Sequence, residues 1–222
     1  MKGRTNASPV DPGTCKKLLQ HLGDSGVRAL DAVSGSRRSV VEALASEYRP
    51  LRDRELEGLL AKQSIDTGQS GAIHCPPVLK GNPALMPLLY ARIDFSGERP
   101  DAHFRLALFD LDSSAKNAIG WRFETPSQGD LGVHDYHHAQ MVSELIRGKL
   151  LSSDQWYNQT MPAFLLDAHS PAGLIISLIV SLYGITYLNE LLALDFRNEV
   201  RSVATSMESI KRYWERMSES QR

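Results

Sequence analysis

Three of the seven histidines lie within residues 134–138, whose sequence is His-Asp-Tyr-His-His. This segment is the one local concentration of residue types that can do acid–base or metal chemistry. His134 and His138 are four residues apart, so on a helix they share one face and can hold an ion or an acidic group between them. The spacing of His138, Met141 and Leu145 predicts such a helix over residues 133–146.

The same five residues fit the pattern H-D-x-x-H, which resembles the zinc-protease signature H-E-x-x-H with aspartate in place of glutamate. The resemblance implies that His134 and His138 bind zinc and that Asp135 polarises a metal-bound water. The chain would then be a metal-dependent hydrolase, a nuclease or a peptidase. The downstream histidine of the longer signature is missing, which leaves Asp154 and Asp167 as candidates for a third ligand. No other cofactor is expected.

Two further interpretations of the histidine segment need no metal. In the first, His138 is a buried, satisfied core histidine, and His134 and Asp135 cap the helix. In the second, the segment is part of a polar binding surface at the edge of a sheet. The residues of that surface would be Trp121, Arg122, His134, Tyr136, His137 and Gln140.

Composition restricts the classes of protein that the chain can belong to. The 222 residues include 25 lysines and arginines and 26 acidic residues, a formal charge of -1, which argues against a protein that coats nucleic acid. Cys15 and Cys75 lie far apart, so neither a disulfide framework nor a cysteine-rich zinc site is expected. The polar N-terminus lacks the apolar stretch of a secretory signal. These features predict a cytoplasmic location.

The periodicity of apolar residues predicts an α+β fold. Alternating residues indicate three strands, at 89–95, 103–111 and 119–123, which would form an antiparallel meander flanked by helices. We expect an N-terminal helical subdomain at 1–64, a linker loop at 65–87, the meander with its histidine-rich helix at 88–168, and a long C-terminal helical hairpin at 169–222.

Several short helices in the N-terminal subdomain suggest a second kind of binding. Pro12 opens a helix that Gly23 ends, Ser36 caps a second helix, and Pro50 opens a third. Helices in series can bind DNA, and the arginines available to contact phosphate are Arg37, Arg38, Arg49, Arg52 and Arg54. Acidic residues alternate with them, so an ordinary mixed-charge surface is the favoured interpretation.

The hairpin at 169–222 carries the remaining signals. Residues 169–189 have no charged side chain and are long enough to cross a membrane, but basic anchors are missing beside them. Burial in the protein core is therefore favoured, and a membrane partner is not expected. Residues 196–217 follow a heptad pattern typical of a coiled-coil-like helix that packs on its predecessor or on a second copy.

The heptad pattern and the incomplete catalytic motif together indicate function. We expect an accessory or assembly subunit that acts through protein–protein contacts in a larger cytosolic complex, with self-association through residues 196–217 as one form of contact. The metal-dependent hydrolase and the DNA-binding protein are the alternatives.

Overall fold

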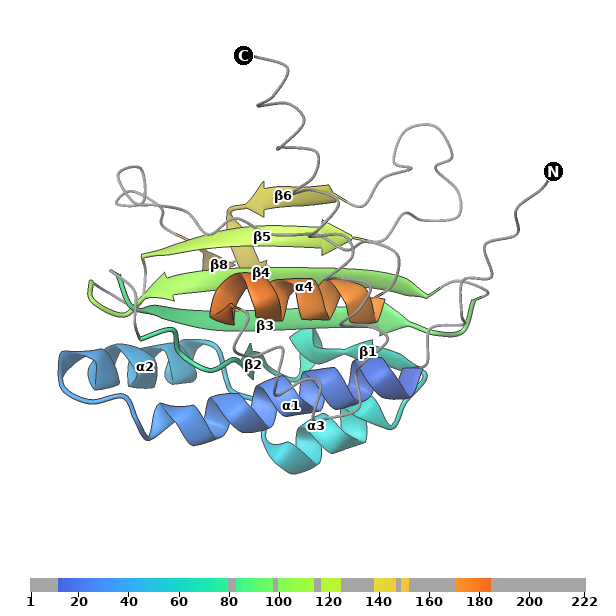
Figure 1. The fold of residues 1–222 in the computed structure, drawn as a ribbon, viewed down its shortest axis with the longest axis horizontal. Helices are drawn as coiled ribbons and strands as arrows, with labels where there is room; N and C mark the ends of the chain where they lie inside the picture. Colours follow the sequence, from blue (N-terminus) through green and yellow to red (C-terminus); the bar gives the residue numbers. More distant parts are fainter. Residues whose placement is uncertain are drawn as a thin grey trace, which may run out of the picture.

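The computed structural model describes residues 12–79, 83–97, 100–113, 117–124, 138–146, 149–151 and 171–184. They form an α+β fold, as expected, in which helices pack on an antiparallel sheet (Figure 1). The helices are α1 (Pro12–Leu30), α2 (Ser36–Glu47), α3 (Asp53–Leu60) and α4 (Pro171–Tyr183), with a short 3-10 turn at Thr67–Gln69. The strands are β1 (Ser64–Asp66), β2 (Ile73–His74), β3 (Leu85–Asp94), β4 (Asp101–Asp110), β5 (Ala118–Glu124), β6 (His138–Val142), β7 (Glu144–Ile146) and β8 (Lys149–Leu150).

The main sheet extends on both sides of the three strands that the sequence suggests. Its order is β1-β3-β4-β5-β6, and β2 also pairs with β3, which makes six strands. Every pair in it is antiparallel. The range 65–87, expected to be a linker loop, therefore contains the end of β1, all of β2 and the start of β3. That expectation is wrong because short strands of two or three residues leave no periodic signal.

The helix predicted over 133–146 is wrong for residues 138–146. His138–Val142 form β6, which pairs with β5, and Glu144–Ile146 form β7, which pairs with β8. Pairing with β6 satisfies the backbone groups that β5 would otherwise expose along its outer edge. A five-residue strand is too short for its alternation to be distinguished from a helical spacing.

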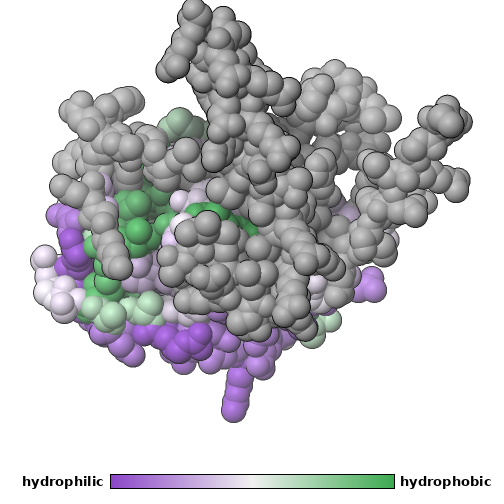
Figure 2. Space-filling model, viewed as in Figure 1, coloured by the Kyte–Doolittle hydropathy of each residue, from purple (hydrophilic) through white to green (hydrophobic). Residues whose placement is uncertain are grey.

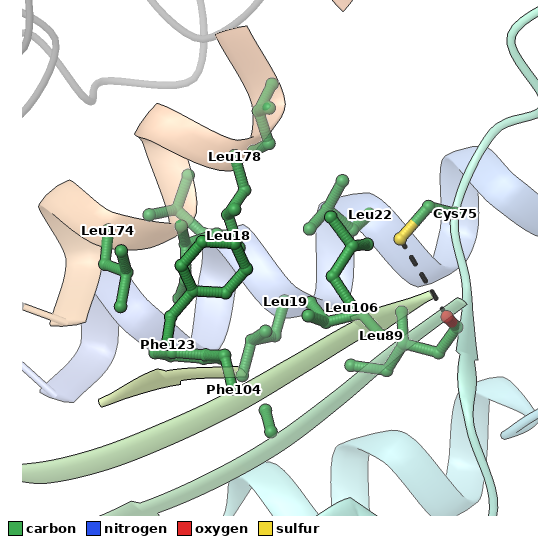
Figure 3. Packing of buried hydrophobic residues seen from close by; sticks show 14 of the residues in the cluster. Leu18, Leu19, Leu22, Cys75, Leu89, Phe104, Leu106, Phe123, Leu174 and Leu178 are labelled. Carbon is green, nitrogen blue, oxygen red and sulfur yellow. Dashed lines mark hydrogen bonds between the residues drawn. The ribbon is translucent and has the colours of Figure 1, made fainter. Parts of the chain in front are cut away.

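One face of the sheet makes the larger core. Alternate residues of β3, β4 and β5 point to this face, where α1 and α4 pack on them (Figure 3). Residues that meet there include Leu18, Leu19 and Leu22 of α1, Leu89, Phe104, Leu106 and Phe123 of the sheet, and Leu174 and Leu178 of α4. The described helices α1, α3 and α4 and the sheet thus share one core.

The opposite face of the sheet carries a second core, to which α2 and Leu145 of β7 contribute. There Met86 and Leu88 of β3 and Phe109 of β4 pack against Val41 and Leu44 of α2. The ring of Tyr48 lies 5.2 Å from that of Phe109. This second core buries β3 on both faces over much of its length, whereas the alternation in the sequence predicts a half-buried strand.

Helix α1 continues through Gly23 to Leu30, so the expected end at Gly23 is wrong. The glycines of this helix allow close packing. A Cβ atom on Gly23 would lie 2.8 Å from Cδ2 of Leu56, and one on Gly26 would lie 1.7 Å from the backbone oxygen of His74.

The third helix begins at Asp53 rather than at Pro50. In Figure 2 hydrophilic residues colour the lower edge, where α1 and α3 lie in Figure 1.

The apolar helix α4 is buried as predicted. All residues from Pro171 to Val180 are buried, and the helix contacts α1. Among the described residues no helix is long and apolar enough to cross a membrane. The second half of the expected hairpin, with the heptad pattern at 196–217, lies outside the described residues.

Candidate functional site

The histidine segment is only partly described. His134, Asp135, Tyr136 and His137 lie outside the described residues, while His138 begins β6 and pairs with Glu124. Since His138 is in a strand, the argument that it shares a helical face with His134 no longer holds. The zinc pair and the role of Asp135 stay predictions. Within the part of the chain that the structure describes, no group of three or more histidines, cysteines or acidic residues could hold a metal.

The structure separates two residues that the sequence places on one binding surface. Trp121 and Arg122 are neighbours in β5, so their side chains point to opposite faces. Trp121 is 8% exposed and belongs to the larger core, which makes its assignment to the polar surface wrong. Arg122, in contrast, is opposite Gln140 of β6, and its Nη2 donates a hydrogen bond of 2.7 Å to the Gln140 Oε1.

Polar side chains fill the part of the second sheet face that α2 leaves open. The register aligns them in two rows across the strands, which we call the polar face. The first row is Asp66, Arg92, His103 and Glu124, and the second is Tyr90, Arg105, Arg122 and Gln140. Most of these residues line a hollow of about 700 Å³, together with Gly68, Gln69 and Leu145. The hollow has the size of a small-molecule binding site.

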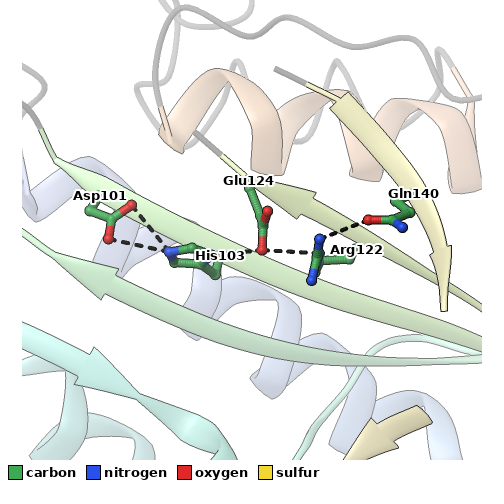
Figure 4. Close-up of polar contacts among 5 residues, drawn as sticks. All are labelled: Asp101, His103, Arg122, Glu124 and Gln140. Carbon is green, nitrogen blue, oxygen red and sulfur yellow. Dashed lines mark hydrogen bonds and ion pairs between the residues drawn. The ribbon is translucent and has the colours of Figure 1, made fainter. Parts of the chain in front are cut away.

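A chain of polar contacts connects three strands of this face (Figure 4). The two ring nitrogens of His103 lie 3.0 Å from the Glu124 Oε1 and 3.2 Å from the Asp101 carboxylate. The Glu124 Oε1 is also 3.0 Å from the Nε of Arg122, which in turn contacts Gln140. The contacts therefore fix Arg122 and Glu124 in place from both sides.

Two groups in the second row of the polar face are left over from this chain of contacts. Arg105 makes no hydrogen bond or ion pair with any other residue that the structure describes. Tyr90 is 6% exposed, and its hydroxyl has no hydrogen-bond partner among those residues. Burial, with a smaller contribution from Tyr48, raises the pKa of the Tyr90 phenol, which keeps this hydroxyl protonated and able to donate.

Most of the polar face was not predicted from the sequence. Polar residues occupy alternate positions in the central strands, and this alternation is the signal that could have revealed the polar face. Tyr90 and Arg92 alternate with apolar residues in β3, and so do His103 and Arg105 in β4. The register then brings both sets to one face.

The arginines considered for DNA binding have acidic neighbours. Three of them lie within ion-pair distance of a carboxylate: Arg37 at 2.5 Å from Asp112, Arg38 at 3.1 Å from Glu42, and Arg49 at 2.8 Å from Glu55. The pKa of Glu55 is lowered, first by the hydrogen bond from Arg49. Guanidinium groups held by carboxylates are less available to phosphate. DNA binding stays a prediction that none of these contacts tests.

A buried pair of titratable residues, His74 and Cys75, lies away from the polar face. His74 is 2% exposed, its Nε2 lies 2.6 Å from the backbone oxygen of Tyr48, and burial lowers its pKa. Burial also raises the pKa of Cys75 to about 12. A neutral imidazole and a protonated thiol in the core are typical of structural residues, and we assign them no chemistry.

Comparison of the chain with protein-family models, with curated proteins and with solved structures gives no match in any of the three. The polar face is therefore the feature of the molecule that bears on function. It offers guanidinium, phenol and amide donors from four adjacent strands beside a limited number of carboxylates. Groups of this kind bind and orient a polar partner.

Proposed function

We propose that the chain is an accessory or assembly subunit that acts through protein–protein contacts, and that the polar face is where a partner binds. The observation that supports this most directly is the hollow of about 700 Å³ over β3, β4 and β5. It lies on a sheet whose other face is core, so the strands hold Arg105 and Arg122 on a rigid base. Binding residues placed on rigid elements lose little conformational entropy when a partner binds.

The composition around the hollow also supports a protein contact. Interfaces between proteins are enriched in arginine, tyrosine and methionine. Tyr90, Arg105 and Arg122 line the hollow, and Met141 of β6, which is 61% exposed, lines a smaller hollow beside Arg105. An exposed methionine beside unpaired polar groups suits the rim of such an interface.

Quantitative co-purification tests the proposal. The full chain and its Arg105→Gln, Arg122→Gln and Arg54→Gln variants are expressed in the cells of origin, and the proteins that each retains are measured by mass spectrometry. Arg54 is in α3 and does not line the hollow, so Arg54→Gln controls for the loss of one charge. We expect the two variants of the polar face to lose the same partners and Arg54→Gln to keep them. Identical recovery for all four proteins would rule out a role for the polar face.

Self-association through residues 196–217 is the second part of the proposal, supported by the heptad pattern of the sequence. Light scattering of the full chain and of a chain that ends at residue 195 compares their masses in solution. A larger mass for the full chain alone supports the proposal, and two monomers would contradict it.

A further inference from the structure

Arg105 and Arg122 are directly opposite each other across β4 and β5. Like charges in this position destabilise an antiparallel pair. Arg122 has compensation, because its Nε lies 3.0 Å from the Glu124 Oε1 and its Nη2 donates to Gln140. Arg105 has none among the described residues. The sheet therefore carries a charge repulsion that its own described residues do not relieve.

Two buried donors lie in the same row. The hydroxyl of Tyr90, opposite Arg105 in the register, has no partner in the described part of the chain. The Nε–H of Arg122 is likewise buried and makes no directed hydrogen bond, although its nitrogen is within ion-pair distance of Glu124. Buried donors without acceptors destabilise a fold unless something else supplies the acceptor. Tyr90, Arg105 and Arg122 all line one hollow.

We infer that the hollow binds a carboxylate group, held by the guanidinium groups of Arg105 and Arg122 with the Tyr90 hydroxyl as a further donor. A carboxylate is planar and can accept two parallel hydrogen bonds from a guanidinium group. It also carries only one negative charge. A dianionic phosphate would meet the carboxylates of Glu124 and Asp66, which line the same hollow. The inference rests on the proposed function, of which it names the ligand chemistry.

Three probes that differ only in the head group test this. Benzoate, phenylphosphonate and benzamide are titrated into the full chain, and binding is followed by NMR shifts of backbone amides. We expect benzoate to shift amides of β4 and β5 and to bind at least tenfold more tightly than the other two. A blocked peptide with one glutamate, compared with its glutamine analogue, tells whether a protein side chain can supply the carboxylate as well as a free acid does.

Variants separate binding from folding. We expect Arg105→Gln to weaken benzoate binding roughly tenfold or more, since hydrogen bonds to charged groups are the strong ones. Tyr90→Phe should weaken it severalfold. Neither variant should lower the urea midpoint, because one removes a repulsion and the other an unpaired hydroxyl. A residue with a structural role only would lower the midpoint. Arg54→Gln should change neither quantity.

The outcomes also separate this inference from the proposed function. If benzoate and the glutamate peptide fail to bind while Arg105→Gln still loses its protein partners, the carboxylate is wrong and the protein contact remains. Tighter binding of phenylphosphonate would replace the carboxylate by a phosphate. Unchanged benzoate affinity in Arg105→Gln would contradict the site itself.

Discussion

Replacing Gly26 by alanine should destabilise the fold, because α1 crosses the backbone of β2 at this residue. An added Cβ would lie 1.7 Å from the backbone oxygen of His74 and 2.7 Å from its carbonyl carbon. Real Cβ atoms essentially never come within 3.0 Å, so helix and strand would have to separate by roughly 1.3 Å. The strand cannot easily give way, since β2 pairs with β3 and the imidazole of His74 contacts the backbone of Tyr48.

The size of the loss in stability follows from the core residues that α1 contributes. Leu18 and Leu19 of this helix are fully buried in the larger core, and a displaced helix would pull them from their places. Overpacking costs about 1–3 kcal/mol, and a clash with backbone belongs at the upper end of that range. Alanine has a better helix propensity than glycine, which stabilises the helix by about 1 kcal/mol and offsets part of this cost. We therefore expect Gly26→Ala to lower the free energy of unfolding by about 2 kcal/mol.

Urea unfolding followed by circular dichroism measures this difference, with Gly58→Ala as the matched control. Gly58 is also within a helix, α3, but a Cβ there would have nothing within 4 Å. The control should gain about 0.5–1 kcal/mol from helix propensity alone. If Gly26→Ala is as stable as Gly58→Ala, the close approach of α1 to β2 is wrong.

Three further predictions concern pairs and buried groups. The pKa of His74 is lowered in the folded protein, so the unfolded chain binds more protons at low pH. The free energy of unfolding should therefore fall as the pH drops below about 6.5. Urea midpoints measured across pH test this, and His74→Gln should flatten the profile. Cys15 and Cys75 are buried, and the Cys75 pKa is raised to about 12, so a thiol reagent should label neither in the native state and both in urea. Arg37 and Asp112 should show a coupling of about 0.5–1 kcal/mol in a double-mutant cycle of unfolding free energies, a modest value because both side chains are 35% exposed.

Each of these has a result that would contradict it. A His74→Gln variant that keeps the full loss of stability at low pH would assign that loss to other groups. Rapid labelling of Cys75 in the folded protein would show that the thiol is accessible. A coupling of zero between Arg37 and Asp112 would mean that solvent screens the pair, although the same contact lowers the pKa of Asp112.

The sequence predicts those parts of the fold that long periodic segments encode. The apolar alternation in 103–111 gives β4, and the uncharged stretch after residue 169 gives the buried helix α4. Short strands such as β1, β2 and β6 escape prediction because their pairing depends on neighbours distant in the chain. Gly23 misleads for a related reason, since its role is to make room for Leu56 of another helix.

The candidate site was harder to predict than the fold. Its residues come from β1, β3, β4, β5 and β6, and only their register reveals that Tyr90, Arg105, Arg122 and Gln140 form one row. Sequence reasoning favours clusters such as the histidines of residues 134–138, because their members are close together in the chain. Neighbours across strands become visible only when the pairing is known. The alternation of polar and apolar residues within a strand is the only signal of this site that the sequence contains.

The contact between α1 and α4 has a consequence for how the chain is made. The main sheet joins strands that follow one another closely in the chain, whereas α1 and α4 come from opposite ends of the described part. During synthesis, the leucines of α1 are therefore complete long before the helix that covers them leaves the ribosome. We expect a nascent chain stalled before residue 171 to bind a hydrophobic dye or a chaperone, and a folded chain that includes α4 to lose that binding. Equal dye binding by the two chains would show that α1 is covered without its late partner.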